Sequence, residues 1–253
     1  MSSALPQEMQ KHTYAIMDEV EGLHWWFVGR RAILESFLEP LVARVKLETL
    51  DPEILDVGCG TGANLEMLSQ FGPSQGVDVS DEALEFCRKK GLSVKKGLAE
   101  DLPFSPDSFD ITTALDVIEH LDDDVAGLKE MFRVTKHGGY SLFFVPAFMW
   151  LWGVQDDISN HRIRYTQRQI VERIKNAGYT IERATYANWT FFPPILAGRV
   201  FMKLTGIKPE SENNINVSAL NGFFGKIFSA ERFWLKNFNF PFGVSIVVVA
   251  KKI

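Results

Sequence analysis

The chain has 253 residues, of which 46% are hydrophobic and 23% are charged, and its mean hydropathy of -0.03 is that of an ordinary globular protein. Its formal net charge of -5 and isoelectric point near 5.6 argue against a broad basic face, so no nucleic-acid partner is expected. The two cysteines, Cys59 and Cys87, make neither a disulfide framework nor a zinc pattern, and no apolar run approaches the ~20 residues that span a bilayer.

The N-terminal stretch lacks the basic-then-apolar design of a secretory signal peptide. Together with the low cysteine count, this predicts a reducing, cytoplasmic location. The length allows one elaborated domain over 1–253, in which we expect residues 1–50 to form a helical cap.

Apolar runs of strand length alternate with helical patterns, which predicts an α/β fold with a parallel sheet and helices on both faces. The expected strands are Glu53–Val57, Gln75–Val79, Ser93–Lys96, Phe109–Ala114, Tyr140–Val145, Tyr179–Thr185 and the β-branched run "GVSIVVVAKK" at the end of the chain. The expected helices are Ala63–Gln70, Asp81–Lys90, Asp123–Thr135 and Thr166–Ala177, the last with Thr166 as its N-cap and Gly178 as its stop.

Residues 187–242 form a predicted insertion before the last strand, rich in Phe, Trp, Pro and Asn. Its run "NWTFFPPILAGRVFMKLTG" is aromatic and apolar, but Pro193, Pro194 and Arg199 prevent it from crossing a membrane as one helix. We interpret the insertion as an α-helical lid whose Phe192 contacts the substrate. A contact in a homodimer and a segment resting on a membrane surface are the alternatives.

The stretch "ILDVGCGTG" places glycines at 58, 60 and 62, where a strand hands over to a helix. Glycines at such a turn let a nucleotide-type ligand approach the main chain without interference from Cβ atoms. Asp56 just ahead of the turn would repel a pyrophosphate but suits a cation. A second acid, Asp78, ends the next strand, where a carboxylate can accept both hydroxyls of a ribose.

From Pro52 to Pro146 the chain resembles the class I S-adenosylmethionine-dependent methyltransferases, in particular the broad group related to ubiquinone-biosynthesis enzymes. The resemblance is carried by "ILDVGCGTG", "GVDVS", "GLAEDLPFSPDSFDIT", "ALDVIEHLDD" and "HGGYSLFFVP". It implies a Rossmann-like sheet of seven strands whose last strand is antiparallel. It also implies S-adenosyl-L-methionine as cofactor, bound across the carboxyl ends of the first and fourth strands.

The resemblance also implies a set of cofactor contacts. Gly58 and Gly60 would lie under the methionine part, Asp78 would hold the ribose, and Ala99 with Glu100 would border the adenine. Relatives often have Asp where this chain has Leu98, so Glu100 or Asp101 is expected to take its place. The complete predicted cofactor set is Asp56, Gly58, Cys59, Gly60, Asn64, Asp78, Val79, Ala99, Glu100 and Asp116.

Methyl transfer mainly needs an acceptor held in line with the S–CH3 bond, and a base only when the acceptor arrives protonated. His120 in "DVIEH" is one candidate base; a structural histidine is the alternative. Asp116, Glu119 and His120 also match a segment that binds a divalent metal in ubiquinone-related O-methyltransferases. Many relatives share this pattern without a metal, so no metal ligand is assigned.

His161 in "NHRIRYT" is the second candidate base, with Tyr165 as a third catalytic candidate. Arg162 beside them could clamp an anionic group of the substrate, although a solvated turn is the alternative for the whole segment. Among the adjacent aromatics Trp25, Trp26 and Phe27, at least one should line a pocket. Trp25 and Trp26 are therefore the predicted substrate contacts; a hydrophobic staple of the first helix is the alternative.

The sequence thus predicts a methyltransferase acting on a small-molecule or lipid- or saccharide-linked acceptor, with oxygen as the expected acceptor atom. An RNA or protein methyltransferase and a non-catalytic cofactor binder are the alternatives. An appended basic domain would indicate an RNA or protein methyltransferase. Loss of the glycine turn or of Asp78 would indicate a non-catalytic cofactor binder. The protein is expected to be a monomer or a homodimer without a transmembrane segment.

Overall fold

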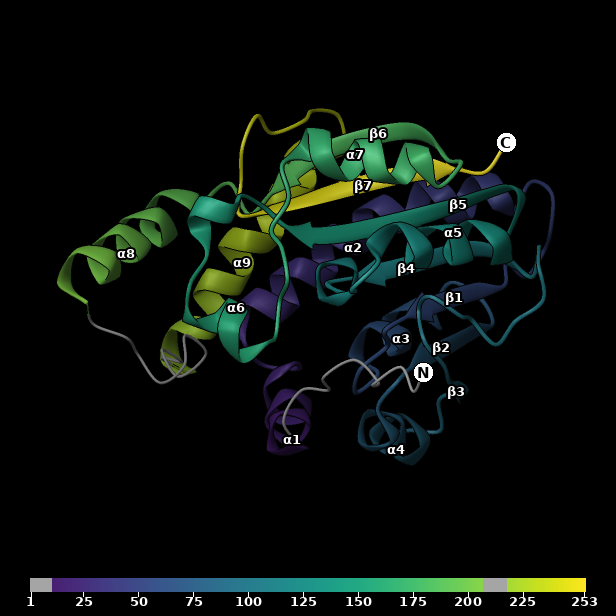
Figure 1. The fold of residues 1–253 in the computed structure, drawn as a ribbon, viewed down its shortest axis with the longest axis horizontal. Coiled ribbons are helices and arrows are strands. Elements are labelled where there is room, and N and C mark those ends of the chain that lie inside the picture. The colour runs from purple at the N-terminus through teal and green to yellow at the C-terminus, as the bar shows by residue number, and fades with distance from the viewer. Residues whose placement is uncertain (1–10, 207–217) are drawn as a thin grey trace.

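The computed structural model describes residues 11–206 and 218–253. Its core is one sheet of seven strands in the order β3-β2-β1-β4-β5-β7-β6 (Figure 1). The strands are β1 (Ile54–Val57), β2 (Ser74–Asp78), β3 (Val94–Lys96), β4 (Phe109–Leu115), β5 (Thr135–Pro146), β6 (Thr180–Ala187) and β7 (Ser245–Lys251). The strands from β1 to β5 pair in parallel, whereas β7 is antiparallel to both β5 and β6. The predicted α/β fold, including the antiparallel last strand, is therefore confirmed.

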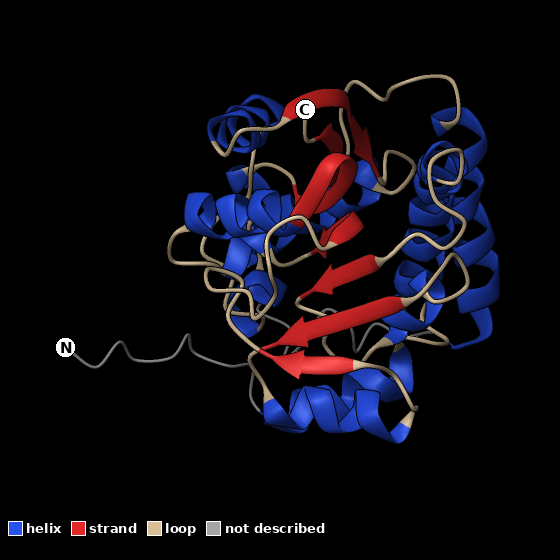
Figure 2. Ribbon diagram, turned by 90° about the vertical axis from the view of Figure 1, so that its right-hand side faces the viewer, coloured by secondary structure: helices blue, strands red, loops and turns tan. Residues whose placement is uncertain are grey.

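Helices lie on both sides of the sheet, as the edge-on view in Figure 2 shows. They are α1 (Lys11–Val20), α2 (Trp25–Val45), α3 (Ala63–Leu68), α4 (Asp81–Lys89), α5 (Asp124–Val134), α6 (Val154–Ile158), α7 (Gln167–Asn176), α8 (Phe192–Thr205) and α9 (Ser218–Leu235). Two short 3-10 turns, η1 (Ile118–His120) and η2 (Met149–Leu151), follow β4 and β5.

Alternation along the central strands produces the two cores. On β5, Phe143 and Val145 point into the core that α5 and α7 complete, whereas Leu142 and Phe144 point into the core that α2 and α9 complete. This period of two is the geometry of a strand buried on both faces. The sheet is therefore a rigid central layer whose carboxyl edge can carry a site.

The predicted helices agree with the structure to within a few residues, and α7 begins as its sequence indicates. The Thr166 hydroxyl accepts from the Gln169 backbone N–H at 3.3 Å, and the Gln169 side chain accepts from the Thr166 backbone N–H at 2.8 Å. This reciprocal pair is a capping box. It fixes where the segment carrying His161 and Tyr165 ends and α7 starts.

The two helices of the β6–β7 segment differ in how they pack. Helix α9 lies along α2 and inserts Phe228 and Leu235 into the core on that face of the sheet. Helix α8 extends away from the sheet at one end of the molecule (Figure 1). The segment as a whole therefore combines a core helix with a projecting one.

Candidate active site

The glycine turn between β1 and α3 has the backbone that its residues predict. Gly58 and Gly60 have φ of 70° and 53°, a region that favours glycine. A Cβ on Gly58 would lie 2.5 Å from Val117, whereas a Cβ on Gly60 would meet nothing within 4 Å. Gly58 is therefore required for packing, and Gly60 borders open space that a bound ligand can use.

Asp78 at the end of β2 holds this turn in place. One carboxylate oxygen accepts from the Gly60 N–H and the other from the Ser80 N–H, each at 2.9 Å. Val79 beside it is half-buried, and the Cys59 side chain packs in the core with Cys87. Asp78 thus supports the turn, and its contact with a ribose stays a prediction, while the Cys59 side chain is committed to the core.

Asp56 on β1 is almost completely buried, and one of its carboxylate oxygens accepts from the Thr113 hydroxyl at 2.7 Å. Its other oxygen has no hydrogen-bond partner among the described residues. Burial raises the pKa of Asp56 to about 7, against the opposing effect of the Thr113 hydrogen bond. A carboxyl in this state becomes anionic readily when a cation approaches.

Asp116 follows β4 at a φ of 61° and forms an ion pair with Arg30 of α2. The same guanidinium donates to the Asn64 side-chain oxygen at 3.0 Å and lies 4.9 Å from the centre of the Trp26 ring. Arg30 is buried, and its Nε has no partner among the described residues. The cluster therefore joins two predicted cofactor residues, Asn64 and Asp116, through an arginine that the sequence analysis did not identify.

The three adjacent aromatics at the start of α2 diverge. Trp25 packs against Phe191 with ring centres 4.5 Å apart, Trp26 lies beside the Arg30 guanidinium, and Phe27 is buried. His24 caps the helix by accepting from the Trp26 N–H at 3.3 Å. Only Trp26 thus adjoins the charged cluster, whereas Trp25 joins α2 to the insertion.

Ala99 and Glu100 follow β3 at the predicted adenine end. Ala99 is buried and Glu100 is half-buried, with one carboxylate oxygen that has no hydrogen-bond partner among the described residues. Burial raises the pKa of Glu100. This acceptor is available for an exocyclic amine at the position where Leu98 offers none.

His161 and Asp156 form the best-defined proton-accepting pair near the carboxyl end of β4. His161 Nδ1 lies 2.7 Å from a carboxylate oxygen of Asp156, which is fully buried and also accepts from Arg164 Nε at 2.7 Å. These hydrogen bonds overcome the effect of burial and lower the pKa of Asp156 to about 2. Asp156 thus stays anionic and directs His161 Nε2 away from itself.

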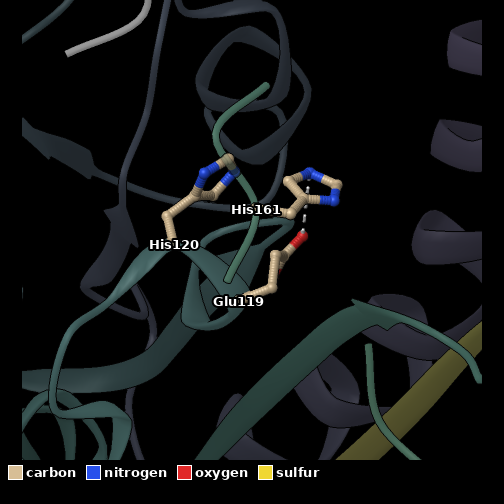
Figure 3. Close-up of side chains that lie close together, drawn as sticks. All are labelled: Glu119, His120 and His161. Carbon is tan, nitrogen blue, oxygen red and sulfur yellow. Dashed lines mark ion pairs between the residues drawn. The ribbon is translucent and has the colours of Figure 1, made fainter. Parts of the chain in front are cut away.

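The His161 ring lies beside η1, which carries Glu119 and His120 (Figure 3). Its Nε2 is 4.0 Å from a carboxylate oxygen of Glu119, and the two imidazole rings are 4.7 Å apart, edge to face. Burial raises the pKa of Glu119 well above its usual range, and burial together with His161 lowers that of His120 to about 3. His120 is therefore neutral and a weak base.

Glu119, His120 and His161 could also hold a metal ion, since their ligand atoms lie within 4.8 Å of one another. Neither carboxylate oxygen of the fully buried Glu119 has a hydrogen-bond partner among the described residues. A bound ion would require these side chains to move closer together. His161 replaces Asp116 in this group, because Asp116 is paired with Arg30.

The structure does not support Tyr165 as a catalytic residue, and it pairs Arg162 with neighbouring loops of the protein. Tyr165 is fully buried, its hydroxyl donates to Asp124 at 2.8 Å, and burial raises its pKa, so it cannot reach or deprotonate an acceptor. The Arg162 guanidinium pairs with Asp122 at 2.9 Å and donates to the His120 carbonyl at 3.1 Å. Both residues therefore fasten the loops that carry the histidines.

Phe192 begins α8, and its ring lies 5.8 Å from Trp150 and 4.9 Å from Phe242. Phe148 contacts it as well, at 6.4 Å, and stacks on Tyr186 at 5.2 Å. The apolar wall around Phe192 is thus built by β5, β6 and the insertion together.

Comparison with known proteins supports the sequence prediction. Residues 55–143 match the family of methyltransferase domains. The chain is 31% identical over 133 residues to 2-methyl-6-phytyl-1,4-hydroquinone methyltransferase 2 of Oryza sativa, covering 50% of this chain and 38% of that protein. It is 32% identical over 102 residues to the ubiquinone biosynthesis O-methyltransferase of Pseudomonas fluorescens, covering 36% of this chain and 43% of that protein. The matches thus span about two fifths of these relatives.

The fold has solved counterparts over nearly its whole length. A Thermotoga maritima structure, described as a methyltransferase and possible histamine N-methyltransferase, superposes with a TM-score of 0.58. The alignment covers 95% of this chain and 97% of the other, at 22% identity. At this identity the likeness concerns the fold, and it agrees with the seven-stranded arrangement described above.

Proposed function

We propose that this chain, a member of the class I S-adenosylmethionine-dependent methyltransferases, methylates a hydroxyl group on a small, apolar, phenol-type acceptor. The observation that carries the proposal is the Asp156–His161 pair beside the glycine turn and the Arg30–Asp116 cluster. One of the two relatives above is named for a phytyl-bearing hydroquinone and the other for ubiquinone biosynthesis by O-methyl transfer, which supports a phenolic acceptor with an apolar tail.

The cleft residues match the groups of S-adenosylmethionine. Arg30 offers a fork of donors to the α-carboxylate, and Asp116 accepts from the α-ammonium, so their ion pair would open to receive a zwitterion. Asp78 accepts from the ribose, and Glu100 accepts from the adenine amine. When bound, the cofactor supplies a methyl group already activated on a sulfonium.

The protein then has to orient the acceptor and remove one proton. Asp156 fixes the tautomer in which Nδ1 of His161 carries the hydrogen, so the Nε2 lone pair can take the proton of the acceptor hydroxyl. With the cofactor bound, its sulfonium would supply the methyl group to the acceptor oxygen, and His161 would hold the proton that leaves the acceptor hydroxyl.

The insertion over 187–242 acts in this proposal as the lid, and residues 1–50 as the cap that supplies Arg30 and Trp26. Phe192 and its aromatic neighbours form the apolar side of the acceptor site. Closure would exclude water while the charge on the sulfonium is neutralised.

Calorimetry with S-adenosylhomocysteine tests the cofactor half of the proposal. We expect micromolar-scale affinity, with Asp78→Ala or Arg30→Ala weakening it by about 1.5–3 kcal/mol, the range for a charged hydrogen-bonding partner. Asp51→Ala, which removes an exposed carboxylate from the loop before β1, is the control and should bind normally. Binding of NADH with no binding of S-adenosylhomocysteine would refute the assignment.

The acceptor half is tested with methyl-labelled cofactor and a set of hydroquinones and catechols, with and without a prenyl tail. The expected product is an O-methyl ether, identified by its mass and by the position of the methyl group in NMR spectra. Methyl transfer to a ring carbon would contradict the choice of oxygen. Labelling only of added RNA or protein would contradict the small-molecule class.

A further inference from the structure

The outward face of α8 is apolar. Its exposed stripe, here called the α8 stripe, consists of Pro193, Ala197, Val200, Phe201 and Leu204. These positions recur at intervals of three and four residues, so they lie on one side of the helix. Phe201 is 59% exposed and Leu204 is 82% exposed, values that are large for such side chains at the end of a folded helix.

The opposite face of α8 carries a buried charge. Arg199 is almost completely buried, with its Nη1 4.0 Å from a carboxylate oxygen of Asp156. A rotation of α8 that buried the stripe would remove Arg199 from this pairing and expose apolar neighbours in exchange. The anchoring of Arg199 thus holds the stripe outward.

A band of exposed aromatic rings continues from the base of α8. Trp150 contacts Phe192, Phe192 contacts Phe242, and Phe242 contacts Trp189, with ring centres 4.9 to 6.2 Å apart. Trp189 then stacks on Phe240, which stacks on Trp234 at the end of α9. Trp150, Trp189 and Trp234 are 48%, 42% and 52% exposed. Tryptophans with one apolar side and one wet side are typical of the membrane–water interface.

Basic residues outnumber acidic residues in the same segment: the sequence over 188–244 holds six basic and three acidic residues, and two of the acids, Glu210 and Glu212, lie outside the described residues. Between β6 and β7 the described residues include five basic side chains and one acidic side chain: Arg199, Lys203, Lys226, Arg232 and Lys236 against Glu231. Glu231 is buried and accepts from the backbone N–H groups of Asn188 and Thr190. Every exposed charge among these residues is therefore a cation, although the whole chain has a net charge of -5.

We propose that the α8 stripe, together with the exposed rings of Trp189 and Trp234, docks the protein onto an anionic lipid surface. Helix α8 projects from the body (Figure 1), so it can enter a soft surface without a matching hollow, which a second copy of the chain would have to provide. The cations of the segment complement anionic headgroups. Among the described residues no helix is long and apolar enough to cross a bilayer, so the contact is peripheral.

Co-sedimentation of the full chain with phosphatidylcholine vesicles, with and without about one third phosphatidylglycerol, tests the proposal. We expect binding to the anionic vesicles, weaker binding to neutral ones, and a decrease as salt is added. The double variant Phe201→Ser/Leu204→Ser should bind at least about tenfold more weakly, because it removes the two large apolar side chains that are most exposed on α8.

Leu47→Ser/Leu50→Ser is the matched control. These leucines are 86% and 87% exposed in the loop after the C-terminal end of α2, and their loss should leave vesicle binding unchanged. Absence of vesicle binding by the wild type, or equal binding by the α8 variant, would overturn the proposal. So would a concentration-dependent dimer in sedimentation that the α8 variant abolishes, since a second copy would then be the occupant. Vesicle binding is measured without cofactor or acceptor and thus does not depend on methyl transfer.

Discussion

At the scale of single residues, the site contains two buried carboxyl groups whose pKa values are shifted in opposite directions. Asp56 has a pKa raised to about 7 by burial, and Asp156 has one lowered to about 2 by His161 and Arg164. Both side chains are buried, and the difference follows from their partners: one hydroxyl at Asp56, and an imidazole with a guanidinium at Asp156. Such pairs of groups with separated pKa values are characteristic of active sites.

The first residue-scale prediction concerns the pH dependence of stability. Because the folded pKa of Asp56 exceeds its unfolded value of 3.8, its contribution is fully present below pH 3.8 and is lost as the pH rises through about 7. Between pH 5 and pH 8 the wild type should lose roughly 2.5 kcal/mol of unfolding free energy that Asp56→Asn does not lose. Denaturant titrations at pH 5 and pH 8 measure this difference. Parallel pH profiles of the two proteins would contradict it, and Asp101→Asn serves as the surface control.

The second residue-scale prediction concerns Asp156 as the residue that positions the base. Asp156→Asn should lower kcat by about 10²-fold or more while KM for the cofactor changes little, because the amide no longer selects the His161 tautomer. His161→Ala should cost about 10²–10⁴-fold, the range for a general base. The pH profile of kcat distinguishes positioning from structural damage, since only a changed base shifts its acidic limb. An unchanged kcat in both variants would mean that catalysis rests on orientation alone.

At the scale of elements, α8 is tied to the catalytic loop through one close approach. A Cβ on Gly153 would lie 0.9 Å from Arg199 Nη1, so the glycine just before α6 leaves room for the α8 arginine. Arg199 in turn lies beside Asp156, the partner of His161. The position of α8 and the orientation of the base are thus linked through a single carboxylate.

We therefore predict that Gly153→Ala displaces Arg199 and loosens α8. Hydrogen exchange should become faster in 192–205, and kcat should fall, with little change in cofactor affinity. Gly198→Ala within α8 is the matched control, because a Cβ there meets nothing within 4 Å and alanine favours a helix by roughly 1 kcal/mol. If hydrogen exchange in 192–205 of Gly153→Ala stays at the wild-type rate, then α8 is not coupled to the catalytic loop.

At the scale of the whole molecule, binding of the cofactor should increase the free energy of unfolding. A ligand that binds only the folded chain adds about 2.7 kcal/mol at a concentration of 100 Kd. Hydrogen exchange with cofactor and acceptor should show added protection in 24–30 and 188–205, and little change in the central strands. Unfolding that is insensitive to S-adenosylhomocysteine at high concentration would contradict the proposed cofactor.

Local sequence patterns were sufficient to predict the fold. The β-branched run of β7 and the Thr166 capping box act within a few residues, so their structures could be read from sequence alone. Arg30 and Asp156 could not, because each becomes functional through contacts with partners whose positions depend on the folded chain. The sequence signal for Arg30 was its place in "WWFVGRR", four residues after Trp26, which puts both side chains on one face of a helix. Tyr165 was mistaken for a catalytic residue because sequence proximity to His161 says nothing about burial.

The antiparallel pairing of β6 with β7 has a consequence for how this protein can change over evolutionary time. Ala187 pairs with Ser245, so the 57 residues numbered 188–244 leave and re-enter the sheet at one point. Closing such a loop instead of a four-residue turn costs only about 2 kcal/mol of chain entropy, since the cost grows with the logarithm of length. The burial of Phe228 and Leu235 can offset that cost. The segment can therefore change in length at a small entropic cost as long as Arg199 keeps its place beside Asp156, which leaves the acceptor and the surface contact free to diverge while the glycine turn stays fixed.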